Sequence, residues 1–414
     1  MPGRERPRDP DRPRQSRPAG AAGRLTARLA AAAALALALA PVALLPVPAL
    51  AHASLVASDP RPAAVLPAAP AAITLRFSEA VTAAGPGITV LAPSGRPVGL
   101  GPVRVSGGAM STAFRSAGEG TYLVRWQVIA ADTHPSRGQL TFSVGRPSTP
   151  PAGEDLGADV GSVSPAGLLL QGLARWLHLL GVALAFGVIA FRTFVLPDAE
   201  ARHAARLDAL VAAGIALLIV AEPVALAAQA LSLGVVAGDL VVSSFGRVLG
   251  LRLGAALLLW AGGGAVRQAG RGRAALLALG VALTVVDGLA GHRLSGLPDA
   301  AALALSATHE AAMAVWLGGL AAVVVTRSGA RRFGRMALAA FAVLTLSGAA
   351  MAVAHLRGPA DLAGTTYGTV LAAKVAAAAA AALIAGLGAR RLEAAALAGV
   401  VALAGLLVSL PPPR

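Results

Sequence analysis

The sequence predicts a mixed fold, in which a β-sandwich near the N-terminus is followed by an all-α membrane bundle of about eight helices. Of the 414 residues, 56% are hydrophobic and only 13% are charged, a composition too apolar for a soluble protein of this length. Residues 52–146 are polar, are punctuated by Gly and Pro, and alternate with a period of two. Residues 166–410 instead contain successive apolar stretches of roughly 20 residues, the length that crosses a bilayer.

The first 51 residues have the three parts of an export signal. An Arg-rich lead is followed by an Ala/Leu core over residues 29–45 and by the small-x-small triplet that ends at Ala51. We therefore expect residues 1–51 to be a signal peptide. Cleavage after Ala51 would make His52 the first residue of the mature chain.

The segment from 52 to 146 is predicted to be an exported all-β domain, most simply a sandwich. Alternation places every second apolar side chain on one face of each strand: Ile73, Leu75 and Phe77; Tyr122, Val124, Trp126 and Val128; and Leu140, Phe142 and Val144. Residues 147–165 are rich in Pro, Gly, Ser and acids without periodicity, so we interpret them as a linker.

Residues 166–410 form the predicted transmembrane domain. Its eight apolar spans lie at about 167–194, 207–231, 247–266, 274–292, 301–326, 336–355, 369–388 and 392–410. With an exported β domain the first span runs inward, and the inside loops then carry eleven arginines: Arg202, Arg206, Arg267, Arg271, Arg273, Arg327, Arg331, Arg332, Arg335, Arg390 and Arg391. The outside loops and the tail carry four: Arg247, Arg293, Arg357 and Arg414. This bias predicts a multi-pass protein of the plasma (inner) membrane with its N-terminal domain extracytoplasmic.

The net charge of +15 does not require a nucleic-acid partner. Residues 1–51 contain eight arginines and three acids, and much of the remaining excess lies in short loops between spans. We expect the lipid bilayer, and no nucleic acid, as a partner. The chain has no cysteine, so a metal site must use His, Met, carboxylates or a free amine.

Three residues of the exported domain form a candidate metal site. The amine and imidazole of His52 can chelate one ion, and Asp132 and His134 are two residues apart, on one face of an extended segment. Three nitrogens and one oxygen suit tetragonal Cu(II). The alternative is that Asp132 and His134 belong to a surface turn before Pro135.

The stretches "HASLVASDPRPAAVL", "ITLRFSEAV" and "YLVRWQVIAADTHPSRGQLTFSVG" resemble the periplasmic copper-binding CopC family over nearly all of residues 52–146. The resemblance implies an Ig/cupredoxin-like β-sandwich that binds Cu(II) through a histidine brace, here His52, Asp132 and His134. Some members also hold Cu(I) in a Met-rich loop, whereas this domain contains only Met110.

Histidines and methionines of the spans suggest a transmembrane copper path. His178, His292, His309 and His355 all fall on the outer side, at one level, in the predicted topology. Met313 follows His309 by four residues and Met351 precedes His355 by four, so each pair shares a helix face, with the soft sulfur about one turn deeper. The alternative is neutral, hydrogen-bonded histidines and gap-filling methionines.

We single out five charged residues inside the spans. Glu310 is next to His309 and Asp287 precedes His292 by five residues, so either acid could support a histidine or act as a counter-ion. Arg175 and Lys374 are candidate partners for these acids; Glu222 is the remaining member of the set.

The stretches "RWLHLLGVALAFG", "HEAAMAVWLGGL" and "YGTVLAAKVAAA", within residues 165–390, are similar to the CopD family of membrane copper-resistance proteins, often fused to a CopC domain. The resemblance implies that the membrane domain moves copper inward. No ATP-binding signature of the P-loop type is present. We therefore expect a non-enzymatic protein of copper import, homeostasis or resistance, with copper as its only metal and a copper chaperone or reductase as a further partner.

Two other classes stay open at this point. Histidines on neighbouring helices can ligate haem, so a membrane redox protein, such as an electron carrier or cupric reductase, is the first alternative. A copper oxidase or a polysaccharide-attacking enzyme built on the brace is the second.

Overall fold

The computed structural model describes residues 53, 55–130, 135–151, 165–197, 201–269, 272–289, 294, 296–410 and 413. The predicted signal peptide, most of the linker, and His52, Asp132, His134 and His292 lie outside the described residues.

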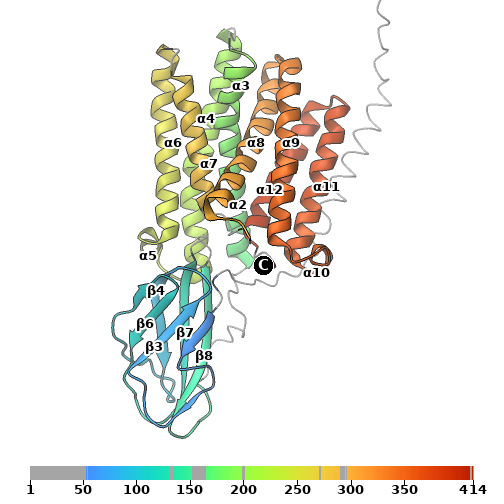
Figure 1. Cartoon of the computed structure of the whole chain (residues 1–414). Coiled ribbons are helices and arrows are strands. Elements are labelled where there is room, and N and C mark those ends of the chain that lie inside the picture. The colour runs from blue at the N-terminus through green and yellow to red at the C-terminus, as the bar shows by residue number, and fades with distance from the viewer. Residues whose placement is uncertain are drawn as a thin grey trace, which may run out of the picture.

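The β domain contains two four-stranded sheets (Figure 1). The first has the order β1-β3-β6-β5, with bounds Leu55–Asp59, Ala72–Phe77, Ala109–Ala113 and Arg104–Ser106. The second has the order β2-β8-β7-β4, with bounds Val65–Leu66, Pro135–Val144, Gly120–Ala130 and Val81–Leu91. Only the β2–β8 pair is parallel among the named strand pairs of the described residues.

The two sheets enclose the side chains that alternation assigned to the core. All of the apolar residues predicted to face inward are buried: Ile73, Leu75, Phe77, Tyr122, Val124, Trp126, Val128, Leu140, Phe142 and Val144. Phe77 and Trp126 meet edge to face across the two sheets, with ring centroids 5.0 Å apart. The β-sandwich prediction is therefore confirmed.

Eight long helical segments follow the linker. The first runs through α2 (Pro165–Val182), the π-helical turn η1 (Ala183–Gly187) and α3 (Val188–Phe194). The others are α4 (Ala201–Leu233), α6 (Ser244–Ala269), α7 (Arg273–Leu289), α8 (Asp299–Thr326), α9 (Ala330–His355), α11 (Thr366–Gly386) and α12 (Arg390–Val408). Two short helices, α5 (Ala237–Val241) and α10 (Asp361–Gly364), lie between them.

By length and composition, seven of the described helical segments could span a membrane. The predicted span at 274–292 corresponds to α7, which has 17 residues and packs between α6 and α8. The bundle of about eight helices is therefore confirmed.

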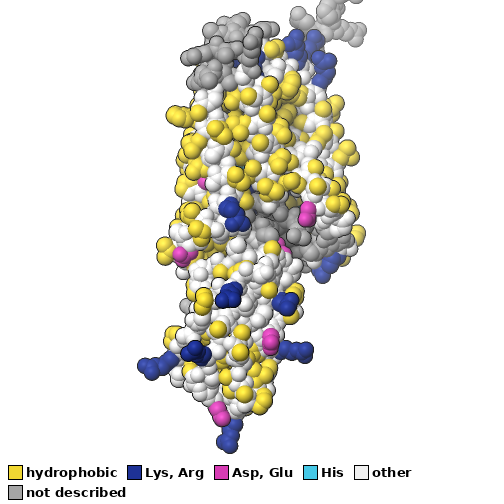
Figure 2. All heavy atoms as spheres, turned by 60° about the vertical axis from the view of Figure 1, so that its left-hand side comes forward, with side chains coloured by type: hydrophobic (Ala, Val, Ile, Leu, Met, Phe, Trp, Pro, Cys, Tyr) yellow, Lys and Arg dark blue, Asp and Glu magenta, His cyan; other side chains and the backbone are white. Residues whose placement is uncertain are grey.

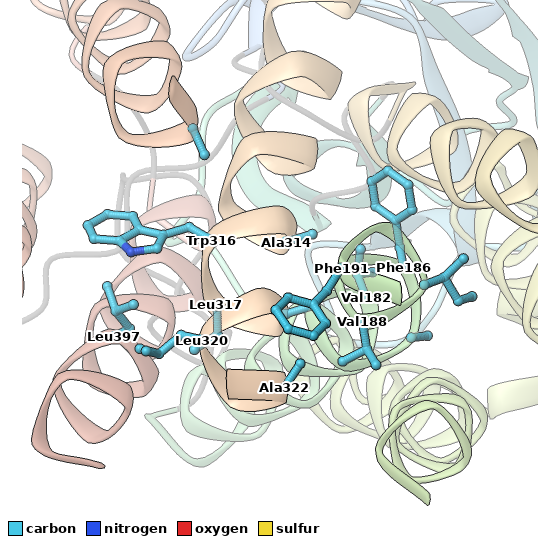
Figure 3. Close-up of a cluster of buried hydrophobic side chains, with 14 of the residues drawn as sticks. Val182, Phe186, Val188, Phe191, Ala314, Trp316, Leu317, Leu320, Ala322 and Leu397 are labelled. Atoms are coloured by element: carbon cyan, nitrogen blue, oxygen red, sulfur yellow. The ribbon is translucent and has the colours of Figure 1, made fainter. Parts of the chain in front are cut away.

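Helix α8 occupies the centre of the bundle (Figure 3). Trp316 and Leu317 extend toward α12, where Leu397 lies, while the other side of α8 faces Phe186 and Phe191 of the α2–α3 segment. The backbones approach closely there, since a methyl group on Gly187 would overlap the carbonyl oxygen of Ala314. Small residues permit such close helix packing.

The two ends of the bundle differ in charge. The β domain lies at one end, and the α8–α9 turn lies at the other, where Gly329 approaches Val195 just after α3 (Figure 1). Within the helical part, arginines gather at that far end and apolar side chains cover the helices, while further arginines lie on the β domain (Figure 2). The described arginines at the α8–α9 turn and at the start of α12 are Arg327, Arg331, Arg332, Arg335, Arg390 and Arg391.

An apolar contact joins the β domain to the bundle. We call it the seam and define it by its buried members: Ala84, Ile129, Leu233, Leu240, Phe245 and Leu249. The first two belong to the β domain, and the others to the end of α4, to α5 and to the start of α6. The backbone is close here too, because a methyl group on Gly85 would come within 2.9 Å of Val235.

Candidate metal centre

The predicted copper ligands of the β domain lie outside the described residues, but their chain neighbours converge. Ser136 donates a hydrogen bond of 2.9 Å from its hydroxyl to the carbonyl oxygen of Ala53. Both residues are fully buried. Ala53 follows His52 directly, and Ser136 is two residues beyond His134. The start of the domain is thus fastened to the strand that follows the Asp132-x-His134 segment.

The same region adjoins the membrane bundle. Ile129 and Ala130 end β7, and residues 131–134 connect β7 to β8. Ile129 belongs to the seam, and the hydroxyl of Ser244, at the start of α6, lies 3.5 Å from the carbonyl oxygen of Ala130. The connection that carries Asp132 and His134 therefore starts at the end of the sandwich that contacts the bundle.

Inside the bundle, His178 of α2 is held between two carboxylates. Its Nδ1 lies 2.7 Å from Oε1 of Glu222 on α4, and its Nε2 lies 2.9 Å from Oδ2 of Asp287 on α7. All three side chains are buried, with exposed fractions of 3 to 8% for their residues. Buried ionisable groups are costly in a membrane domain and require such partners.

Two further charged groups complete this cluster. Arg252 of α6 donates from Nε to Oδ1 of Asp287 at 2.5 Å. Glu310 of α8 brings a third carboxylate, because its oxygen, Nε2 or Nδ1 of His178 and an oxygen of Asp287 can all lie within 4.8 Å of one another. We call His178, Glu222, Arg252, Asp287 and Glu310 the His178 cluster. Five helices contribute one residue each.

His309, the neighbour of Glu310 on α8, faces a different helix. Its Nδ1 lies 2.9 Å from the hydroxyl of Ser347 on α9, and its ring lies against Gly348. No described carboxylate is hydrogen-bonded to this ring, and the Lys374 ammonium of α11 acts on it electrostatically. His309 thus sits in a neutral to positive environment.

The remaining described residues of the predicted path also lie on this side of α8. His355, at the end of α9, has its Nδ1 2.8 Å from the hydroxyl of Tyr367 on α11. Met351 places its sulfur 4.0 Å from the hydroxyl of Ser306. Met313 is partly buried and packs against the central core of the bundle.

The expectation that the histidines lie at one level is wrong for His309 and His355. His309 is opposite Ser347, which precedes His355 by eight residues on α9. At 1.5 Å per residue, the two rings differ in depth by about two turns, or roughly 12 Å. The difference in depth depends on the register between α8 and α9, which the sequence alone does not fix.

Comparisons with known proteins match two parts of the chain. The CopC domain family matches residues 55–145, and the family "Copper resistance protein D" (CopD) matches residues 328–409. Protein YobA of Escherichia coli K12 is 35% identical over 98 residues, which are 23% of this chain and 79% of YobA. Copper resistance protein C of Xanthomonas campestris pv. juglandis is 31% identical over 105 residues, 23% of this chain and 82% of that protein. The chain belongs to the CopC/CopD family.

Solved CopC structures align with the same N-terminal region. CopC from Methylosinus trichosporium OB3b is 25% identical and covers 23% of this chain and 95% of its own, with a TM-score of 0.22. PcoC, a methionine-rich copper resistance protein from Escherichia coli, is 34% identical, with coverages of 23% and 99% and a TM-score of 0.20.

Membership of the CopC/CopD family assigns copper binding, transport and resistance to the chain in general terms. The CopD match comprises α9 to α12 and so includes Met351, His355 and Lys374. The His178 cluster and His309 precede it in the chain.

Sequence reasoning singled out four of the five members of the His178 cluster but paired them differently. Asp287 and Glu310 were expected beside His292 and His309, and Arg175 or Lys374 were the suggested partners of the acids. The cation that binds Asp287 is Arg252, which sequence reasoning did not single out. Its position inside an apolar span was a usable signal, because an arginine within a span requires a partner.

Proposed function

We propose that the CopC domain captures Cu(II) outside the cell through a brace of His52, Asp132 and His134, and passes it across the seam into the CopD bundle. The amine of His52, two imidazoles and one carboxylate supply the nitrogen-rich donor set that Cu(II) favours. The protein acts as a non-enzymatic importer in copper homeostasis or resistance, with a chaperone or reductase as partner on the inner side.

The hydrogen bond between Ser136 and Ala53 carries this proposal. It fastens the residue after His52 to the strand that begins just after His134. We therefore expect His52 and His134 to be close enough to bind one ion. A surface turn before Pro135 would not require a fully buried attachment to the start of the domain. The hydrogen bond therefore favours the brace over the turn.

The seam supports delivery into the membrane. Leu226 of α4 and Leu249 of α6 pack in the same apolar cluster as Ile129. Glu222 precedes Leu226 by four residues and Arg252 follows Leu249 by three, about one helical turn in each case. Glu222 and Arg252 of the His178 cluster thus lie about one turn beyond the nearest members of the apolar cluster that contains the seam.

Charge supports the orientation. Positively charged loops stay in the cytoplasm, and the arginines concentrate at the end of the bundle away from the CopC domain (Figure 2). We therefore infer that a signal peptide of residues 1–51 exports the CopC domain and that copper moves from the seam toward the arginine-rich end. The path uses His178 first, with His292, His309, Met313, Met351 and His355 as further candidates.

Copper accumulation tests this function directly. Cells that express the protein should accumulate more copper at limiting external copper than cells without it, and His52→Ala and His134→Ala should each reduce that gain. His203→Ala is the matched control, because His203 lies near the start of α4 outside the predicted path. Equal accumulation in all strains would exclude import and favour a protective or redox role.

A further inference from the structure

The His178 cluster has the donors of a cation site rather than of a structural ion pair. Three carboxylates, those of Glu222, Asp287 and Glu310, outnumber the two basic groups, since Glu222 and Asp287 flank His178 and the Arg252 guanidinium donates to Asp287. With all three acids ionised and a neutral imidazole, the cluster has a net charge of −2, which one divalent cation balances. Buried charge of this size is costly without such compensation.

A buried oxygen of Glu310 points to the same conclusion. Its Oε1 has no hydrogen-bond partner among the described residues, and buried carboxylate oxygens normally have one. A bound ion would use this free oxygen.

His178 is oriented as a metal ligand. Its Nδ1 faces Glu222, while its Nε2 faces Asp287 on the other side of the ring. Both ring nitrogens lie at hydrogen-bond distance from a carboxylate, and a cation that replaces the proton on Nε2 would bind there while Nδ1–H stays with Glu222. Glu222 is therefore a positioning residue, and Nε2 of His178 is the donor.

The distances are close to those of a coordinated ion. Ligand atoms about 2.1 Å from a divalent first-row metal lie about 3 to 4 Å from one another. Nε2 of His178 and Oδ2 of Asp287 are 2.9 Å apart, and with Glu310 included the three donor groups lie within 4.8 Å. A contraction of several tenths of an ångström closes the set, and Oδ1 of Asp287 stays with Arg252.

We propose that His178, Asp287 and Glu310 bind a divalent cation within the bundle, with Glu222 and Arg252 holding His178 and Asp287 in place. In a copper-transporting chain the ion is Cu(II), because the donors are one nitrogen and two oxygens, whereas Cu(I) favours sulfur. The inference rests on the proposed function only for the identity of the ion. It implies that copper enters the membrane domain without prior reduction.

His309 is the competing site on the same helix, and the charges distinguish the two. A cation at His309 would be repelled by the positive charge of Lys374, and Ser347 offers only a neutral hydroxyl. A cation at the His178 cluster would meet carboxylates from three helices. Glu310 and His309 are adjacent in the chain but lie on different faces of α8. Substituting each residue alone therefore tests which face binds the ion.

The test is a count of Cu(II) bound to the purified full-length mature chain in detergent, without reductant, after desalting. We expect two ions in the wild type, and one in the His52→Ala, His134→Ala double variant. That remaining ion should give an electron paramagnetic resonance spectrum with a single imidazole nitrogen. Adding Glu310→Gln to the double variant should remove it, whereas Glu393→Gln, which removes a buried carboxylate of α12, should retain it.

The variants also separate this inference from the proposed function. Glu310→Gln alone should leave the brace ion in place, which shows that the chain is folded. A double variant that binds no copper, or that loses its ion through His309→Asn and not through Glu310→Gln, would overturn the cluster as the site. If the brace does not bind copper, the His52→Ala, His134→Ala double variant should instead bind as many ions as the wild type.

Discussion

Glu222 on α4 approaches Nδ1 of His178 on α2 to 2.7 Å, in the interior of a bundle that is otherwise largely Ala, Leu, Val and Gly. The two residues are 44 positions apart in the chain and come together because α2 and α4 pack along each other. The pair gives the imidazole one defined orientation, with Nε2 toward Asp287.

Removing the charge of Glu222 should weaken the membrane site without abolishing it. Glu222→Gln keeps the size of the side chain but supplies a poorer acceptor for Nδ1–H, and loss of such an outer contact typically costs 10- to 100-fold in metal affinity. Titration of Cu(II) into the His52→Ala, His134→Ala chain measures the change. Glu393→Gln is the control, and an unchanged affinity for Glu222→Gln would show that Glu222 does not orient His178.

Ser136→Ala should weaken copper binding by the CopC domain. The variant leaves the carbonyl oxygen of Ala53 buried without its donor, which costs about 1 kcal/mol and loosens the residue next to His52. We expect up to about a tenfold loss of Cu(II) affinity, by competition with a chelator of known strength.

Ser143→Ala is the matched control, since Ser143 lies on the same strand and shares a buried 2.9 Å hydrogen bond with Thr121. Both variants should lower thermal stability, but only Ser136→Ala should change copper affinity. Equal affinities would show that the contact with Ala53 does not shape the brace.

A charge in the seam should uncouple capture from delivery. Val235→Asp places a carboxylate against Gly85 in an apolar contact, where it has no described cationic partner. Copper affinity of the CopC domain should be unchanged while cellular uptake falls. Val236→Asp is the control, because Val236 is 74% exposed and lies outside the seam. Equal uptake by the two variants would mean that the seam is not used in transfer.

The position of the mature N-terminus gives a further prediction. N-terminal sequencing should start at His52, and a glycine inserted before His52 should lower Cu(II) affinity at least about tenfold, because the amine and ring then belong to different residues. A glycine inserted after Ala152, in the linker, should have no effect. A mature chain that begins elsewhere would contradict the brace.

Alternation and apolar length were sufficient to predict the architecture. Ile73, Leu75 and Phe77 form a buried strand face, because side chains two residues apart in a strand point to the same side and these three are all apolar. The membrane spans were predictable because exposing backbone polar groups or charges to lipid is costly, so each span must be a helix of about 20 mostly apolar residues.

Side-chain partners in the bundle were not predictable, because each depends on rotation and register of helices that are far apart in the chain. Asp287 was expected beside His292 from its spacing along one helix, yet it contacts His178 and Arg252 on two others. His309 and Glu310 are neighbours in sequence but face different helices, since adjacent residues are about 100° apart around a helix.

Transfer within one chain is the central claim, and reconstituted protein tests it most directly. Full-length protein in liposomes, with its CopC domain outside, is loaded with labelled Cu(II), and label in the lumen is trapped by an enclosed chelator. The account predicts that label enters with the wild type and that His52→Ala, His134→Ala reduces loading and entry together. Glu310→Gln should keep the brace ion, lose the membrane ion and stop entry. Entry at the wild-type rate with Glu310→Gln would contradict it.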